Sequence, residues 1–147
     1  MTLDESVQTV IIDKIKRAII DNDMVATRAL LNSVRFDKKE LLGLITYDIV
    51  ALAYIVDLDL GVEPGKQPYP TIEALQKWID AKNLPLNPYA VRANIIKNGT
   101  TWYQIGGSHI VTDSINDEAF KEVIELAKPD LQIKIKEQWQ LLFRNNP

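Results

Sequence analysis

Ser108 and His109 are the first residues to consider for catalysis, because His109 is the single histidine in a chain of 147 residues. Adjacent residues on an extended backbone point to opposite faces, so the two side chains cannot act together as nucleophile and base. One histidine in a chain without cysteine also does not make up a zinc site. We therefore interpret His109 as a turn or surface residue and predict no catalytic residue.

An acidic cluster, Asp57, Asp59 and Glu63, is the other candidate for chemistry. Carboxylates two residues apart on a strand share a face and could hold Mg²⁺ or Ca²⁺. The spacing does not match an EF-hand, which has a glutamate at its twelfth position. The sequence favours the solvated face of an edge strand, so we predict no metal and no cofactor. A metal-dependent hydrolase that uses these carboxylates is an alternative.

Composition sets further limits on function. The net charge of −3 and the pI near 5.2 argue against bulk attraction to nucleic acid. The absence of cysteine excludes disulfides and thiolate chemistry. The glycines of "GVEPG" and "IGGS" match neither the dinucleotide nor the P-loop pattern, so we expect no small-molecule substrate. The start "MTLDESVQTV" lacks a signal-peptide pattern, which predicts a protein that does not cross a membrane.

The N-terminal segment has the signals of a helix. Thr2 and Glu5 have the spacing of a capping box, and "DND" at 21–23 ends the pattern. One apolar face is predicted to pack in the core, although part of it could instead contact another subunit. Its members are Leu3, Val7, Val10, Ile11, Ile15, Ala18 and Ile19.

The middle of the chain predicts strands. We expect two or three antiparallel strands between about residues 34 and 60, because the residues from Tyr54 to Leu60 alternate between apolar and polar. A helix over 48–58 is the competing interpretation, since "IVALAYIV" is apolar on every side. Residues 61–70 contain two glycines and three prolines, which is typical of a loop.

Two short helices are predicted between residues 70 and 100. Pro70 is expected near the first turn of one helix, and Asn87 caps the other with Pro88 at its first position. Gly99 is expected to end the second helix. We predict that the pair packs on the sheet and that Trp78, at the flank of the packed face, lies in the core.

The last third of the chain predicts a hairpin and then helix. Short strands are expected on both sides of Gly106-Gly107, and helix from about residue 115 to 144, kinked or broken at Pro129. The expected fold is therefore a single α+β domain over residues 1–147. It has an N-terminal helix, a small antiparallel sheet, two short helices packed on it, and C-terminal helices kinked at a proline.

Residues 27–36, "TRALLNSVRF", resemble a signature of the neck and tail completion proteins of tailed bacteriophages. That family commonly has "TGxLxxSI" after an N-terminal helix and before a strand. Thr27, Leu30 and Ser33 match it, and Val34 stands in place of isoleucine. Arg28 replaces the family's glycine, and glycine adopts a positive φ freely whereas arginine does so at a cost.

A second, longer stretch is similar to the same family. Residues 53–84 resemble its tyrosine-containing segment, which leads into a glycine-proline loop and then a helix with a central "W[IV]" pair. Residues 88–100 resemble the next helix, which ends in "GT". The matching residues of this stretch that we take as structural motif positions are Tyr54, Gly61, Pro64, Trp78, Ile79, Gly99 and Thr100.

The resemblance implies a non-enzymatic structural protein of the virion, assembled in the cytoplasm of a host bacterium. Such proteins form homo-oligomeric rings in the neck or at the head-proximal end of the tail. Their partners are copies of themselves and adjacent virion proteins, such as a portal, an adaptor or the tail tube. DNA passes through the lumen without specific binding, and no membrane is involved. The alternative function is a small cytosolic adaptor or regulator that binds a partner protein through the helices of residues 70–100, with Trp78 as an anchor.

Overall fold

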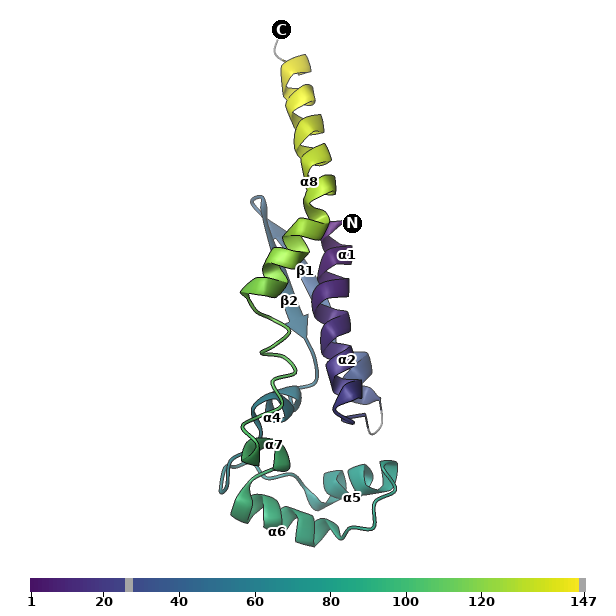
Figure 1. Ribbon diagram of the computed structural model, residues 1–147, viewed down its shortest axis with the longest axis vertical. Coiled ribbons are helices and arrows are strands. Elements are labelled where there is room, and N and C mark those ends of the chain that lie inside the picture. Colours follow the sequence, from purple (N-terminus) through teal and green to yellow (C-terminus); the bar gives the residue numbers. More distant parts are fainter. Residues whose placement is uncertain (26–27, 146–147) are drawn as a thin grey trace.

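The fold, in a computed structural model, is a mixed α+β architecture, as the sequence predicts. The model describes the backbone of residues 1–25 and 28–145, and the side chains of these residues except 133–135 and 138–145. The molecule is elongated, with a β-hairpin beside the N-terminal helix, a pair of short helices at one end and the C-terminal helix projecting at the other (Figure 1).

The N-terminal helix is continuous but changes its winding. It consists of α1 (Leu3–Val7), a π-helical turn η1 (Gln8–Ile12) and α2 (Asp13–Asp21). The predicted capping box is confirmed: the backbone N–H of Glu5 donates to the Thr2 hydroxyl at 3.1 Å, and the Thr2 N–H donates to the Glu5 carboxylate at 2.8 Å. These bonds satisfy two of the N–H groups that a helix start leaves without partners.

This helix supplies most of the core. Ile15 and Ile19 are completely buried, which confirms that the predicted apolar face packs in the core. Ile12, which the predicted face did not include, is completely buried as well. The π-helical turn is contacted both by β1 and by the C-terminal helix. Because it has neighbours on two sides, three consecutive residues can be buried there: Val10, Ile11 and Ile12.

A two-stranded antiparallel hairpin follows the short helix α3 (Ala29–Ser33). Strand β1 (Arg35–Leu41) pairs with β2 (Leu44–Val50), in a register that places Leu41 opposite Leu44. This confirms two of the strands expected between residues 34 and 60.

Polar and aromatic contacts attach the hairpin to the start of α1. The hydroxyl of Tyr47 donates to the carboxylate of Asp4, which also pairs with Lys38 at 3.1 Å. Burial and the Asp4 carboxylate raise the pKa of Tyr47 above its ordinary range, so the phenol remains a donor. Phe36 meets the Tyr47 ring edge to face, with the ring centroids 5.3 Å apart.

The strand predicted from Tyr54 to Leu60 is wrong. Those residues form α4 (Ile55–Leu60), closer to the competing helical interpretation. A strand would put Ile55, Asp57 and Asp59 on one face, but Asp57 is exposed while Ile55 and Asp59 are buried and Leu58 is half-buried. Spacings of three and four residues are those of one helix face. The hydrogen bonds of the buried Asp59 side chain, described below, fix that face.

The hairpin predicted around Gly106-Gly107 is also wrong. Thr100 caps a short helix, α7 (Thr101–Gln104), by accepting from the backbone N–H of Tyr103. Both glycines have positive φ, and they form turns that lead the chain back to α4. The glycine pair therefore marks a change of direction without strands on either side.

The two helices between residues 70 and 100 form as predicted, but they are placed differently. They are α5 (Ile72–Ala81), which begins after Thr71 as its cap, and α6 (Pro88–Asn98), capped by Asn87 and ended by Gly99. Pro70 lies just outside α5.

The expectation that this helical pair packs on the sheet is wrong. α5 and α6 pack on each other, at the end of the molecule away from the hairpin (Figure 1). Leu75 and Ile79 are buried there, whereas Trp78 is 37% exposed and does not lie in the core. The helical spacing predicts that an apolar face packs, but it does not specify which surface covers that face.

The C-terminal helix is α8 (Asp117–Asn145), with Pro129 inside it. The prediction of helix from about 115 to 144 is confirmed, and Figure 1 shows this helix changing direction along its length. Its first half packs on α1 and η1 through residues such as Val123. In the part of the chain that the structure describes, we find no helix with both the length and the apolar character needed to cross a bilayer.

Arg28 adopts a left-handed backbone conformation that glycine adopts more easily. It stands at the start of α3 with φ of 65°, in the left-handed region. An L-residue pays about 1–2 kcal/mol in this conformation, and glycine does not. Arg28 is therefore a strained residue at the start of this helix.

We expect Arg28→Gly to raise the free energy of unfolding by about 0.5–1 kcal/mol, because relief of strain exceeds the added entropy of the unfolded chain. Denaturant titration measures this change. Arg28→Ala is the matched control, because it removes the guanidinium but keeps the Cβ atom, and it should give no gain. Equal stabilities for the glycine and alanine variants would contradict the strain.

Candidate functional site

Four of the phage-motif residues, distant in sequence, meet where the end of α4 passes α7. We call Gly61, Pro64, Gly99, Thr100 and Tyr103 the α4–α7 junction. Two hydrogen bonds close it. The N–H of Val62 donates to the Thr100 hydroxyl at 2.9 Å, and the Thr100 N–H donates to the Val62 carbonyl at 3.0 Å.

The two glycines of the junction are required by close approach. A Cβ atom on Gly61 would lie 2.2 Å from the backbone nitrogen of Tyr103, and one on Gly99 would lie 2.7 Å from the Val62 carbonyl oxygen. Real Cβ atoms do not approach backbone so closely. The "GT" end of α6 and the glycine-proline loop are thus two halves of one packed contact.

Asp59 ties α4 to the segment after α7. Its carboxylate accepts from the backbone N–H groups of Val111 at 2.8 Å and Thr112 at 3.1 Å, and from the Thr112 hydroxyl at 2.7 Å. Its backbone carbonyl accepts from the N–H of His109 at 3.1 Å. The residue is only 7% exposed, and these bonds compensate for burying its charge.

The pKa of Asp59 follows from these contacts. Burial alone would raise it, but the hydrogen bonds from Thr112 and Val111, with a smaller contribution from His109, hold it below the ordinary value for aspartate. The ionised carboxylate is therefore a structural group, which accepts three hydrogen bonds at the centre of a turn.

The residues first considered for chemistry do not assemble into a reactive site. The Ser108 hydroxyl donates to the Leu58 carbonyl, and His109 is exposed. Asp57 is exposed, whereas the carboxylate of Asp59 is engaged in the hydrogen bonds from Val111 and Thr112. Within residues 1–25 and 28–145, wherever side chains are described, no group of three or more metal-ligating residues is arranged to hold an ion.

The first phage motif lies in the core rather than at the junction. Leu30 is buried, and the Ser33 hydroxyl donates to the Leu30 carbonyl at 2.6 Å and accepts from the N–H of Leu52 at 3.0 Å. Ser33 thus connects α3 to the chain after β2. Thr27 lies outside the described residues.

The remaining motif residues are spread over two helices. Tyr54 precedes α4 as its cap and is half-exposed, and burial raises its pKa. On α5, Ile79 is buried while its neighbour Trp78 is partly exposed. The motif residues therefore lie in the core, at the α4–α7 junction and on α5, and do not form one binding site.

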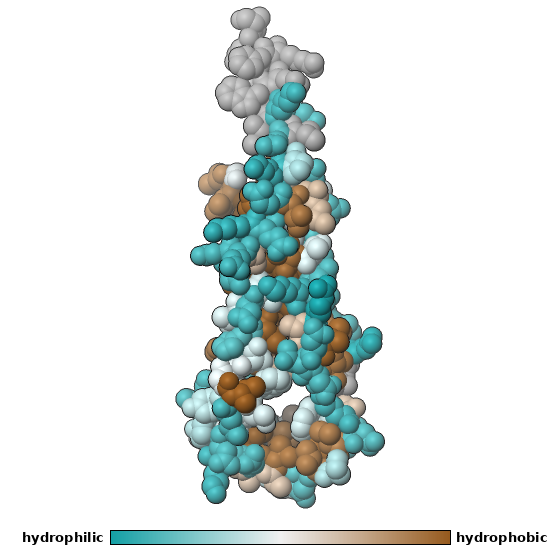
Figure 2. Space-filling view, in the orientation of Figure 1, coloured by the Kyte–Doolittle hydropathy of each residue, from teal (hydrophilic) through white to brown (hydrophobic). Residues whose placement is uncertain are grey.

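The hairpin tip, Leu41 to Leu44, is the most exposed apolar feature near the sheet. Leu42 is 99% exposed, and its neighbours Leu41 and Leu44 are also exposed. Figure 2 shows hydrophobic surface where the hairpin leaves the body. Burial of one leucine side chain stabilises a folded protein by about 1.5–3 kcal/mol. Because its three leucines stay exposed, the tip lacks roughly 4–7 kcal/mol of stabilisation by burial in the isolated chain.

The turn at this tip also breaks the usual rule for its conformation. Leu42 and Gly43 both have positive φ, of 52° and 78°, as in the two-residue turns that prefer Asn-Gly or Asp-Gly. Leucine at the first position is strained and does not hydrogen-bond to its own backbone. Exposure and strain therefore fall on the same residue.

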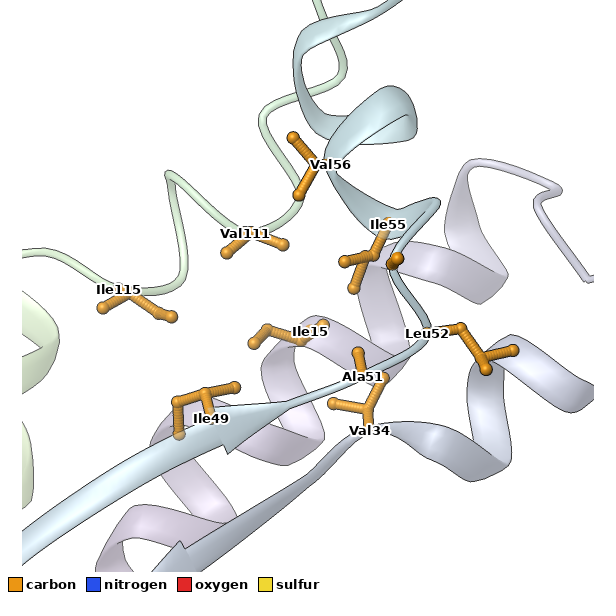
Figure 3. A pocket seen from close by; sticks show the side chains of 10 residues that line it. Ile15, Val34, Ile49, Ala51, Leu52, Ile55, Val56, Val111 and Ile115 are labelled. Carbon is orange, nitrogen blue, oxygen red and sulfur yellow. The ribbon is translucent and has the colours of Figure 1, made fainter. Parts of the chain in front are cut away.

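An apolar cavity of about 290 Å³ lies at the other end of the hairpin. Figure 3 shows aliphatic side chains from several elements converging on it. Of the residues that line it, Ile15 and Val34 are buried, whereas Leu52 and Val56 are exposed.

The sequence did not single out Asp59 as a structural carboxylate, nor the hairpin tip. Asp59 appeared as one of several acidic residues, because its donors lie about fifty residues later in the chain. A signal for the tip was present in "LLGL", a glycine flanked by leucines where a hairpin turn calls for polar residues.

Comparisons with protein-family models, with curated proteins and with solved structures gave no match to this chain.

The junction predicts that two glycines with similar positive φ respond differently to alanine. Gly61→Ala should destabilise the protein by about 1–3 kcal/mol more than Gly65→Ala, because the new methyl group overlaps Tyr103. Gly65 has φ of 74° against 78° for Gly61, and nothing lies within 4 Å of its added methyl group, so it controls for the cost of alanine at a positive φ without the close contact. Equal losses in chemical denaturation would show that the close contact is absent.

Asp59→Asn should lower the free energy of unfolding by about 2 kcal/mol at pH 7, since it leaves buried donors facing an amide. The pKa of Asp59 is lower in the folded chain, so its contribution is complete above about pH 4, the unfolded value, and is lost as pH falls through the folded pKa. The difference in the free energy of unfolding between wild type and variant should therefore become smaller below about pH 4.

Denaturation curves at pH 7 and at about pH 3 measure this gap. Asp57→Asn, an exposed carboxylate in the same helix, is the control and should change stability by less than about 0.5 kcal/mol. A gap for Asp59→Asn that stays constant with pH would contradict the structural role of the ionised carboxylate.

Proposed function

We propose that this protein is a non-enzymatic structural component of a tailed-phage virion, which forms a homo-oligomeric ring in the neck or at the head-proximal end of the tail. The observation that carries the proposal is the hairpin tip, where strained and exposed leucines project from the body. Large apolar groups in such a place are typical of a surface that another protein covers.

The placement of the phage-motif residues supports the same function. Gly61, Pro64, Gly99 and Thr100 belong to two separate parts of the motif and meet in one junction. Positions that share a packed contact are expected to occur together in related sequences. Packing at the junction would thus explain why these residues recur together although they are far apart in the sequence.

The proposed mechanism is geometric. Each subunit presents one surface to its ring neighbour and another to the virion proteins above or below, such as a portal, an adaptor or the tail tube. A head-to-tail contact whose rotation closes fixes the number of subunits. The acidic composition suits a lumen through which DNA passes without binding. Assembly would take place in the cytoplasm of the bacterial host, and the finished ring would remain in the virion.

Native mass measurement of the purified protein tests this function. A single closed oligomer is expected, alone or on addition of the proteins encoded by neighbouring genes, and portal and tail genes are expected on either side of its own. A chain that stays monomeric with those proteins, and is missing from purified virions, would overturn the proposal.

A second candidate is a small protein-binding adaptor that uses the helical pair α5–α6. Its support is the partial exposure of Trp78, since tryptophan is frequent at the centre of protein interfaces. In this case the protein would be monomeric alone and would bind one partner. Its tryptophan fluorescence would change on binding, and Trp78→Ala would remove that binding.

A further inference from the structure

Asn98 and Gly99 form the only Asn-Gly pair in the chain. This pair is the one most prone to deamidation, because the glycine nitrogen has no neighbouring Cβ atom and attacks the preceding side chain with little hindrance. Asn98 is the last residue of α6, where the chain turns into α7 (Figure 1), and its side chain is exposed. The pair therefore stands at the edge of the α4–α7 junction.

The junction requires the glycine of this pair. A Cβ atom on Gly99 would lie 2.7 Å from the Val62 carbonyl oxygen and 2.8 Å from Cδ1 of Tyr103. The φ of Gly99, 77°, also lies in the region that favours glycine. The packing that excludes every larger residue thus keeps, directly after Asn98, the residue that makes it most reactive.

Deamidation at this pair is an intramolecular substitution. The backbone nitrogen of Gly99 gives its proton to water or hydroxide and forms a bond to Cγ of Asn98. The bond from Cγ to the side-chain nitrogen breaks, and ammonia leaves with a proton from solvent. Water then opens the cyclic imide at either carbonyl. One opening gives aspartate, and the other gives isoaspartate, whose backbone is longer by a methylene group.

The folded structure keeps both reacting groups from this path. The N–H of Gly99 donates to the Ile95 carbonyl at 2.9 Å, and the side-chain nitrogen of Asn98 donates to the side-chain oxygen of Asn94 at 2.6 Å. Attack requires a free Gly99 nitrogen and a residue 98 that leaves the helical conformation. The last turn of α6 must therefore open first, and local opening of a helix end needs less free energy than global unfolding.

We propose that Asn98 is a deamidation site that the α4–α7 junction protects. The site is unreactive while Gly99 is packed between Val62 and Tyr103, and it reacts when the end of α6 opens. This property belongs to the single chain and does not depend on the proposed ring.

Isoaspartate at position 98 prevents the junction from closing again. Thr100 exchanges two hydrogen bonds with Val62, of 3.0 Å from its N–H and 2.9 Å to its hydroxyl. A methylene group inserted just before Gly99 displaces both groups of Thr100. The new carboxylate also stands at the C-terminal end of α6, where the helix dipole disfavours negative charge. Transient opening is thus converted into a permanent loss of the contact.

Peptide mass spectrometry of protein incubated at mildly alkaline pH tests the site and its protection. In guanidinium chloride, the peptide that contains Asn98 should show conversion of the amide to a mixture of aspartate and isoaspartate. In native buffer the conversion should be at least about tenfold slower, because only opened molecules react. Asn98→Gln is the matched control and should give no product over the same period. Equal rates in the two buffers would overturn the protection, and an unreactive unfolded chain would overturn the site.

Two glycine variants test whether the junction provides the protection. Gly61→Ala overlaps Tyr103 and should speed deamidation of the folded chain, whereas Gly43→Ala should not, because its methyl group lies in open space at the hairpin tip. Both glycines have φ of 78°. Thr100→Val, which removes the hydroxyl bonded to Val62, serves if circular dichroism shows that Gly61→Ala is unfolded. Equal native rates for the junction variant and Gly43→Ala would overturn the role of the junction.

The consequence of the modification is measured on the modified protein. The isoaspartate form, separated by chromatography and returned to native buffer, should unfold at a lower denaturant concentration than Asn98→Asp. That variant carries the same charge without the added methylene group, so the difference isolates the longer backbone. Equal midpoints would overturn the claim that isoaspartate keeps the junction open.

Discussion

Ile12, Ile15 and Ile19 are completely buried on the N-terminal helix, and the hairpin, α3, α4 and the first half of α8 are all placed by packing around this apolar face. The π-helical turn widens the face at the point where β1 and α8 approach from two sides. A regular α-helix would turn one of three consecutive side chains away from its neighbours. The two-stranded hairpin depends on this contact, because an isolated pair of strands is only marginally stable in water.

Asp59 and the α4–α7 junction add polar contacts where α4 meets the segment that follows α7. An aspartate near the end of a helix is disfavoured by the helix dipole, and burial adds to that penalty. Three hydrogen bonds from Val111 and Thr112 compensate for both terms. The segment between α7 and α8 is therefore held both by these polar contacts with α4 and by Ile110, which is buried in the same apolar core, while Val111 and Ile115 within it line one side of the cavity.

The elements that could be predicted from the sequence are those whose signals lie within a few residues. The Thr2–Glu5 capping box, Asn87 with Pro88 and the long C-terminal helix are local patterns, and all three are confirmed. The strand predicted at residues 54–60 was wrong because a short apolar segment has no decisive period, and distant donors to Asp59 decided its conformation. The placement of α5–α6 was wrong for a related reason, since an apolar face does not specify what covers it.

The candidate site shows the same division. Gly61, Pro64, Gly99 and Thr100 of the junction were singled out because they carry the family resemblance. Tyr103 was not, and no local pattern indicated that Gly61 and Gly99 would both approach it. The hairpin tip was missed because its meaning depends on exposure, which only the folded chain defines. Its leucines are ordinary core residues by type, and the register places them outside the core.

Two residues with strained backbones, Arg28 and Leu42, differ in what compensates for their strain. Arg28 begins the short helix that buries Leu30, so packing within the chain offsets the unfavourable φ. Leu42 has no such contact, since it is 99% exposed and its turn would be more stable with a polar residue. Strain persists at positions where the surroundings stabilise it, and at the hairpin tip a second molecule would supply those surroundings. The strain and the exposure of Leu42 therefore both lower the stability of the isolated chain, and burial of this side chain by another molecule would offset them.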